Sequence, residues 1–223
     1  NGIANDDYVT TANISGVTSL DVIGQNIADL TGIEDFTALT NLNCHNNQLA
    51  SLNVTQITAL TYLDCGVNQL TSLDVSQNTA LTEVFFTNNL LTNLDLSQNT
   101  ALSEVFFTNN QLTSLDLRNG NNQNLLNFNV TSNPNLNCIS VDDSSWATAN
   151  LTMIPNQTIF SNDCNNLQYT LIPDSIFEQR LIDLGYDNIQ DGQVLTANIS
   201  SIDTLILIPP IGGFFVAIPY NTI

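Results

Sequence analysis

Apolar residues return along this chain at a fixed interval of 21 residues, and each return opens a short run in which apolar and polar positions alternate. The segment 70–90, LTSLDVSQNTALTEVFFTNNL, is followed at once by the nearly identical LTNLDLSQNTALSEVFFTNNQ of 91–111. An alternation of period two predicts a β-strand with one buried face, and each copy holds two such runs. The buried columns of the first run are Leu42, Leu63, Val84 and Val105, then Cys44, Cys65, Phe86 and Phe107.

A coil of this size cannot bury its apolar face alone, so successive coils must stack. Parallel strands of neighbouring coils then lie ~4.8 Å apart. After each first strand the chain turns at an asparagine, whose amide can bond backbone groups that the bend leaves unpaired. The second run carries a similar asparagine except at Ile57, where we expect a looser turn. The predicted ladder of the first turn consists of Asn47, Asn68, Asn89, Asn110 and Asn133.

These columns resemble the LxxLxCxxNxLxxLDLxxN unit of leucine-rich repeat proteins, in a bacterial 21-residue subtype common in secreted or surface proteins of the Bacteroidetes. The resemblance covers residues 17–136. It implies a β-rich solenoid with little helix, a right-handed superhelix whose first strands line a concave sheet and whose second short strands lie on the opposite side. It also implies a secreted or bacterial cell-surface location.

The ends of the array depart from the period. The step from Leu102 to Leu125 lengthens to 23 residues within an amide-rich stretch, and 137–164 breaks the pattern and holds the single tryptophan. We therefore expect a first unit over 1–164. It comprises an N-terminal cap and first coil at 1–38, repeats at 39–136 and a C-terminal cap at 137–164.

Residues 165–223 predict the start of a second tandem unit. VLTANISSIDTLIL at 194–207 matches VTTANISGVTSLDV at 9–22 with a constant offset, 196−11=185. A cap helix is predicted at about 174–184, with Asp174 or Ser175 as its N-cap and Glu178 completing a capping box with Ser175. The apolar tail 205–223 departs from the copy and receives no role.

The four cysteines divide into two kinds. We predict a Cys138–Cys164 disulfide across the C-terminal cap, with two free buried thiols as the alternative. Cys44 and Cys65 are predicted to be free core thiols, because stacked parallel side chains point the same way and cannot easily form a bridge.

Composition excludes several classes of function. The chain has two Lys+Arg against 21 Asp+Glu, a formal charge of −19, so nucleic acid and anionic lipid are disfavoured as partners. Apolar residues make up 43%, which is enough for a core, yet no run reaches the ~20 residues of a membrane span. No zinc spacing and no nucleophile, phosphate-loop or metalloprotease motif occurs, so neither an enzyme, a metal nor a cofactor is predicted.

The candidate binding residues alternate with the buried columns and so point outward from the predicted concave sheet. An aromatic ladder beside acids suits a protein partner with basic and apolar groups, or a sugar stacking on rings. The alternative is that the phenylalanine pair only rigidifies the sheet. The set is His45, Tyr62, Asp64, Glu83, Phe85, Glu104 and Phe106.

The resulting hypothesis is an extracellular or cell-surface module that binds a protein or glycan, with head-to-tail self-association also plausible. The alternative function is a structural spacer or adhesin stalk repeat. A third hypothesis, ice or ordered-water binding, comes from the threonine columns, such as Thr61/Thr82. Calcium is conceivable at the column Asp74, Asp95 and Asp116, or at Asp187 and Asp191. We favour instead that each aspartate of the column bonds a serine (Ser76 or Ser97) or the backbone of the neighbouring coil.

Overall fold

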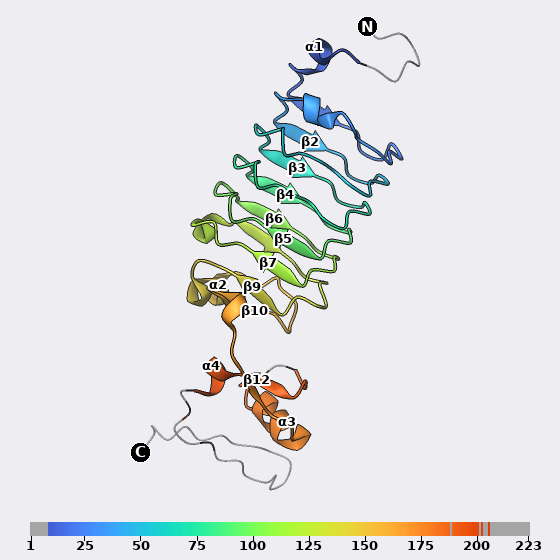
Figure 1. Ribbon diagram of the computed structural model, residues 1–223. Coiled ribbons are helices and arrows are strands. Elements are labelled where there is room, and N and C mark those ends of the chain that lie inside the picture. The colour runs from blue at the N-terminus through green and yellow to red at the C-terminus, as the bar shows by residue number, and fades with distance from the viewer. Residues whose placement is uncertain (1–8, 188, 201, 203–204, 206–223) are drawn as a thin grey trace. The chain divides into compact units, whose positions relative to one another are not determined.

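The computed structural model describes residues 9–187, 189–200, 202 and 205 (Figure 1). By its internal contacts the chain divides after Cys164 into two units. Of the apolar tail 205–223, Leu205 belongs to the described residues and the rest lies outside them.

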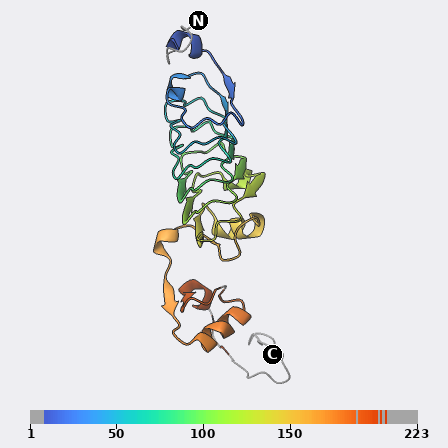
Figure 2. The same ribbon diagram turned by 90° about the vertical axis from the view of Figure 1, so that its right-hand side faces the viewer.

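The first unit is a stack of coils that carries a six-stranded parallel sheet on one side (Figures 1 and 2). Each strand pairs in register with the equivalent residues of the next coil, so that Leu42 lies beside Leu63 and Leu63 beside Val84. Successive coils are 21 residues apart at Thr61 and Thr82, as the repeat predicts. The strands are β1 (Ser19–Asp21), β2 (Asn41–Asn43), β3 (Tyr62–Asp64), β4 (Glu83–Phe85), β6 (Glu104–Phe106) and β8 (Asn127–Asn129).

A second parallel sheet forms from the second runs, but only toward the C-terminal end of the unit. Its strands are β5 (Asn93–Asp95), β7 (Ser114–Asp116), β9 (Cys138–Ser140) and β10 (Ile159–Ser161). The equivalent runs at 52–54 and 73–75 are not strands. The Val54 carbonyl oxygen accepts a hydrogen bond at 2.9 Å from the side-chain amide of Asn78 in the next coil. Asn99 repeats this bond to Val75 at 3.0 Å, so side chains join these coils to their neighbours.

The interior is filled by the columns that the alternation predicts. Leu42, Leu63, Val84 and Val105 are fully buried, and Phe86 and Phe107 stack with ring centroids 5.1 Å apart. Cys44 and Cys65 are buried free thiols, which confirms that prediction. Burial raises the pKa of the Cys44 thiol to about 12, and the nearby Asp64 charge acts in the same direction.

The turn asparagines join neighbouring coils through three kinds of bond. The Asn110 amide nitrogen donates to the carbonyl oxygens of Phe107 in its own coil and of Phe86 in the preceding coil. Its oxygen accepts the Leu91 N–H at 3.1 Å. Equivalent side-chain bonds to the preceding coil occur at Asn47, Asn68, Asn89 and Asn133. Because these amides are largely buried, each turn depends on its asparagine for backbone satisfaction.

The residue before each ladder asparagine has a left-handed backbone. Asn46, Asn88 and Asn109 adopt φ of 56°, 56° and 58°, a region that asparagine tolerates. Val67 occupies the same place with φ 52°, although it is β-branched. The turn at Ile57 keeps the backbone bonds of its counterparts, because Ile57 N–H donates to Val54 and Leu60 N–H donates to Ile57. It lacks the side-chain bonds to the preceding coil that Asn78 makes at the equivalent position.

Short helical segments flank the array. At the start lie α1 (Thr11–Ile14) and the 3-10 turn η1 (Ile33–Asp35). Near the end lie a second 3-10 turn, η2 (Asn122–Asn124), and the helix α2 (Ser144–Asn150). The Cys138–Cys164 disulfide ties the last coil, with Cα atoms 5.9 Å apart and a sequence separation of 26, as predicted. A third 3-10 turn, η3 (Cys164–Asn166), follows it.

The second unit has a small core of its own. Its antiparallel pair β11 (Tyr169–Leu171) and β12 (Gln193–Leu195) accompanies two helices, α3 (Ser175–Asp183) and α4 (Thr196–Ile199). Ile172, Leu181 and Val194 are buried together. Among the described residues, four further apolar side chains pack against them: Phe177, Tyr186, Ile199 and Leu205.

The start of helix α3 confirms one prediction from the sequence and contradicts another. Asp174 is the N-cap and its carboxylate accepts the N–H groups of Ile176 and Phe177, each at 2.9 Å. The predicted Ser175–Glu178 capping box is wrong. The Glu178 side chain is only 2% exposed, and its Oε1 accepts the backbone N–H groups of 191–193. The carboxylate therefore holds a distant loop instead of the helix start.

Candidate functional site

The outward face of the six-stranded sheet presents two parallel rows of side chains. Strand register fixes these rows, because equivalent residues of adjacent coils pair directly. The first row runs Asn41, Tyr62, Glu83, Glu104 and Asn127. The second row runs Asn43, Asp64, Phe85, Phe106 and Asn129. We call Tyr62, Asp64, Glu83, Phe85, Glu104 and Phe106, together with the adjacent His45, the sheet-face patch.

Three aromatic rings form a continuous stack at the centre of the patch. Phe85 and Phe106 lie with ring centroids 5.3 Å apart and planes only 11° from parallel. The Tyr62 ring extends the stack toward the preceding coil, 5.5 Å from Phe85 and tilted by 40°. All three are half-buried, and the Phe85 ring lies between those of Tyr62 and Phe106.

At one side of the stack His45 lies against Asp64. The imidazole Nδ1 is 3.1 Å from Asp64 Oδ1, and because an ionised carboxylate only accepts, Nδ1 carries the proton. The same oxygen accepts the Gly66 N–H at 2.9 Å. Glycine leaves room for the imidazole here, because a Cβ on Gly66 would come within 2.9 Å of Nδ1 and displace the ring. The sequence pattern predicts that His45 and Asp64 point outward. It does not predict that they pair, or that a glycine lies beside them.

The other side of the stack is acidic. Glu83 and Glu104 occupy paired register positions on β4 and β6, and Asn127 donates to Glu104 Oε1 at 3.0 Å. Burial raises the pKa of the Tyr62 hydroxyl, and the charges of Asp64 and Glu83 raise it further. Two carboxylates of the patch thus raise the pKa of its tyrosine.

Both arginines pair with an aspartate near them in the chain. Arg118 pairs with Asp116 of the second sheet at 2.6 Å, and Arg180 pairs with Asp183 of its own helix at 3.0 Å. The patch therefore combines apolar rings with negative charge.

The aspartate column of the second run is engaged in local turns. Asp74 Oδ1 accepts the Ser76 N–H and Asp95 Oδ1 accepts the Ser97 N–H, each at 2.9 Å and within the same coil. The expectation that these carboxylates bond a neighbouring coil is therefore wrong. Hydrogen bonds from Arg118 lower the pKa of Asp116. Among the described residues, no group of three or more His, Cys, Asp or Glu side chains is arranged to hold a metal ion.

The threonine columns direct their hydroxyls to the backbone. Thr61 donates to the Thr40 carbonyl oxygen at 3.1 Å, and Thr82 donates to that of Thr61 at 3.0 Å. Thr113 repeats this bond with Thr92. Their protons are thus used within the solenoid, which leaves these columns a poor template for ordering water.

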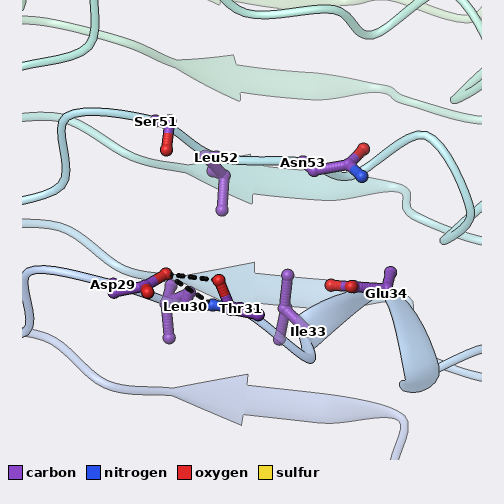
Figure 3. Close-up of a pocket in the computed structure, with 8 residues that line it drawn as sticks. All are labelled: Asp29, Leu30, Thr31, Ile33, Glu34, Ser51, Leu52 and Asn53. Atoms are coloured by element: carbon purple, nitrogen blue, oxygen red, sulfur yellow. Dashed lines mark hydrogen bonds between the residues drawn. The ribbon is translucent and has the colours of Figure 1, made fainter.

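One pocket lies near the start of the array, between the first coil and the next (Figure 3). It measures about 170 Å³, and its acids are already bonded. Asp29 accepts the Thr31 N–H and hydroxyl, as the dashed lines in Figure 3 show. Glu34 accepts the Gly32 N–H at 3.0 Å. With its carboxylates occupied by local turns, this pocket is a weak candidate for a ligand site.

Comparison with solved structures identifies similar folds. The functional domain of InlJ from Listeria monocytogenes, whose structure is described as including a cysteine ladder, aligns with a TM-score of 0.51 and 35% identity over 59% of this chain. Internalin C2 of the same organism aligns with a TM-score of 0.50 and 17% identity, covering 70% of this chain and 78% of that one. A leucine-rich repeat protein of Leptospira interrogans aligns at 0.42 and 22% identity, covering 68% of this chain and 36% of that one.

The fold is a leucine-rich repeat solenoid. The chain spans 31% of the InlJ domain that it matches. No protein-family model matches the sequence, and no curated protein matches it either. None of the described helices has the length and apolar character needed to span a membrane.

Proposed function

We propose that the first unit is a protein-binding module that acts through the sheet-face patch. The observation that carries the proposal is the continuous ring stack of Tyr62, Phe85 and Phe106, half-buried at the centre of the six-stranded sheet. Aromatic side chains are enriched at the centres of protein interfaces. A net charge of −19 favours encounter with a cationic surface.

The preferred partner surface carries apolar groups and lysine or arginine side chains. Such cations can lie over the outer face of Tyr62 or Phe106, at the two ends of the stack, while they approach the carboxylates of the patch. Interaction with the acids is long-range and screened by salt, whereas ring contact is short-range. Salt sensitivity therefore separates the two contributions.

The test compares variants for capture of a panel of purified extracellular proteins by biolayer interferometry. The double variant Phe85→Ser/Phe106→Ser is expected to abolish capture while the chain stays folded at the assay temperature. Its melting temperature should fall, because each half-buried ring contributes about 1–2 kcal/mol. Glu83→Gln/Glu104→Gln should weaken capture and reduce its salt dependence. The matched control is Leu90→Gln, which alters an exposed leucine outside the patch where other coils carry Gln69 and Gln111.

Equal capture by the wild type and the double phenylalanine variant would contradict the proposal. If no panel protein is captured by any variant, the unit is a spacer or stalk repeat instead. Capture of glycans alone, lost with the two phenylalanines, would assign the patch to sugars.

We also propose that the chain works outside the cell, in the manner of the Bacteroidetes subtype of the repeat. The Cys138–Cys164 disulfide supports this location, because such bonds persist mainly in oxidising compartments. Labelling of intact cells with an antibody against the first unit tests it. Signal only after permeabilisation would contradict it.

We propose further that the second unit opens another solenoid of the same type. Helices α1 and α4 have the same sequence, TANI, and the same bounds after a shift of 185 residues, 196−11=185 and 199−14=185. In the second unit Thr196 N–H bonds the Gln168 carbonyl and the Asn198 side chain bonds that of Tyr186. Their counterparts Thr11 and Asn13 are exposed.

This exposed surface of α1 suits a helix-and-hairpin cap like that of the second unit, and we propose head-to-tail association through it. A chimera in which residues 165–195 directly precede Thr11 should raise the melting temperature of the first unit. It should also suppress concentration-dependent association of the parent chain in light scattering. An unchanged melting temperature would contradict the cap, and a strict monomer at high concentration would contradict the association.

A further inference from the structure

The coil between β6 and β8, two residues longer than the repeat, builds a pocket outside the sheet-face patch. Asn127 lies 23 residues after its register partner Glu104, whereas Thr82 lies 21 after Thr61. The additional residues fall between Leu117 and Leu125, where the chain forms η2 after Gly120, whose φ is 76°. This loop meets the start of α2 in the C-terminal cap.

The pocket between loop and cap has a volume of about 300 Å³. That value is at the lower end of the usual range for small-molecule sites. Its lining is unusual for this chain, because it combines amides, two carboxylates and an indole. The residues are Gly120, Asn121, Asn122, Gln123, Asn124, Asp142, Asp143 and Trp146.

Hydrogen bonds hold both walls in place. Gly120 N–H donates to Asp142 Oδ1 at 3.1 Å, and Asp142 N–H donates to Asn122 Oδ1 at 2.9 Å. Asn122 is only 3% exposed, and its amide nitrogen donates to the Leu117 carbonyl at 2.6 Å. Asp143 Oδ1 accepts the backbone N–H of Trp146 at 3.0 Å, which fixes the first turn of α2. The pocket is therefore preformed, and a ligand need not organise it.

Several polar groups at its rim are left for a ligand. Within the described part of the chain, Asp142 Oδ2, Asp143 Oδ2 and the Gln123 side-chain amide make no hydrogen bond. Asp142, Asp143 and Gln123 are exposed, and Trp146 is half-buried against the core. The pocket thus offers acceptors, donors and one flat apolar surface.

We propose that this pocket binds a neutral or amino sugar, at a site separate from the sheet-face patch. A pyranose has an apolar C–H face that packs on an indole and hydroxyls that both donate and accept. An ammonium or guanidinium ligand brings donors only, so it would bond the carboxylates but make no use of the Gln123 N–H groups. Two carboxylates and the overall charge of −19 disfavour an acidic sugar.

Trp146 provides a direct probe, because it is the only tryptophan of the chain. The full chain is titrated with glucose, galactose, mannose, N-acetylglucosamine and glucosamine, and with short oligomers of each, while tryptophan emission is recorded. We expect a saturable change with at least one of these sugars. Gln123→Ala and Asp142→Asn should each raise its Kd by about tenfold, the value of one lost hydrogen bond to a charged or oriented group.

The matched control is the double variant Phe85→Ser/Phe106→Ser, which leaves the pocket intact and should bind the sugar with unchanged Kd. Failure of the protein-capture test thus leaves this titration unaffected, and the reverse also holds. The proposal is overturned if no sugar gives a saturable change. It is also overturned if Gln123→Ala and Asp142→Asn bind the sugar with the same Kd as the wild type. A response to arginine or lysine amides at lower concentration than to any sugar also overturns it and assigns the pocket to basic side chains.

Discussion

Phe106 and Phe107 are neighbours in the chain, yet their rings lie on opposite faces of the same sheet. Phe107 is fully buried and stacks on Phe86 at 5.1 Å, whereas Phe106 is half-buried and stacks on Phe85 at 5.3 Å. Strand alternation alone gives the two identical residues different environments. One ring fills the core of the solenoid and the other belongs to the sheet-face patch.

The two rings should contribute very differently to stability. Phe107→Ala removes a core ring and is expected to lower the free energy of unfolding by about 3–5 kcal/mol. Phe106→Ala loses stacking and partial burial, and should cost about 1–2 kcal/mol. Urea unfolding followed by circular dichroism measures both. Equal losses would show that the alternation does not separate core from surface here.

Val67 should be a site where a polar substitution stabilises the protein. It holds φ at 52°, which costs a β-branched residue about 1–2 kcal/mol, while asparagine accepts this backbone in the neighbouring coils. Val67→Asn is expected to raise the free energy of unfolding by about 1 kcal/mol. The matched reverse change, Asn46→Val, should lower it by a similar amount. Destabilisation by Val67→Asn, measured in urea, would contradict this account.

The buried thiols should make the solenoid sensitive to alkali. Burial raises the pKa of Cys44 from its ordinary 9.0 to about 12, and raises that of Cys65 in the same direction. Above pH 9 the unfolded chain releases thiol protons that the folded chain retains, so stability is full below pH 9 and falls as the pH rises toward 12.

The measurement is the urea midpoint at pH 8 and at successively higher pH. Cys44→Ala/Cys65→Ala should flatten the decline; the remaining slope includes Tyr62, whose pKa is also raised. In the native wild type, both thiols should resist Ellman's reagent at pH 8. Identical slopes for the two proteins would exclude the thiols as the cause.

Glu178 should affect the fold of the second unit and not that of the first. Its Oε1 accepts three backbone N–H groups from 191–193, and each unmet donor costs about 1–3 kcal/mol. Glu178→Ala is expected to abolish hydrogen-exchange protection of these amides, while Glu178→Gln, which keeps an acceptor oxygen, should retain part of it. Gln179→Ala on the exposed face of α3 is the control. Unchanged protection in Glu178→Ala would contradict this role.

The repeat made the main architecture predictable. Because every coil carries the same columns, the register of Leu42, Leu63, Val84 and Val105 follows from their 21-residue spacing, and so does the inward direction of Cys44 and Cys65. The Cys138–Cys164 bridge followed from the position of its cysteines at either end of the cap.

Features that depend on single side chains were not predictable. The alternation gives the direction of His45 and Asp64 but not the glycine that lets them meet. A capping motif gives no sign that Glu178 would serve a loop that follows the helix. The pocket at Trp146 could have been suspected, since the lengthened coil and the tryptophan are both visible in the sequence, but only the fold brings them together.

The segments 70–90 and 91–111 are nearly identical in sequence, and their strands β4 and β6 pair residue for residue. The gene segments that encode them must therefore also be similar. Recombination between the two gene segments that encode them would insert or delete one whole coil in frame, and the new neighbours would meet the same surfaces as the old. Strains should therefore differ in the length of this array by complete coils, and the number of stacked rings would change with it.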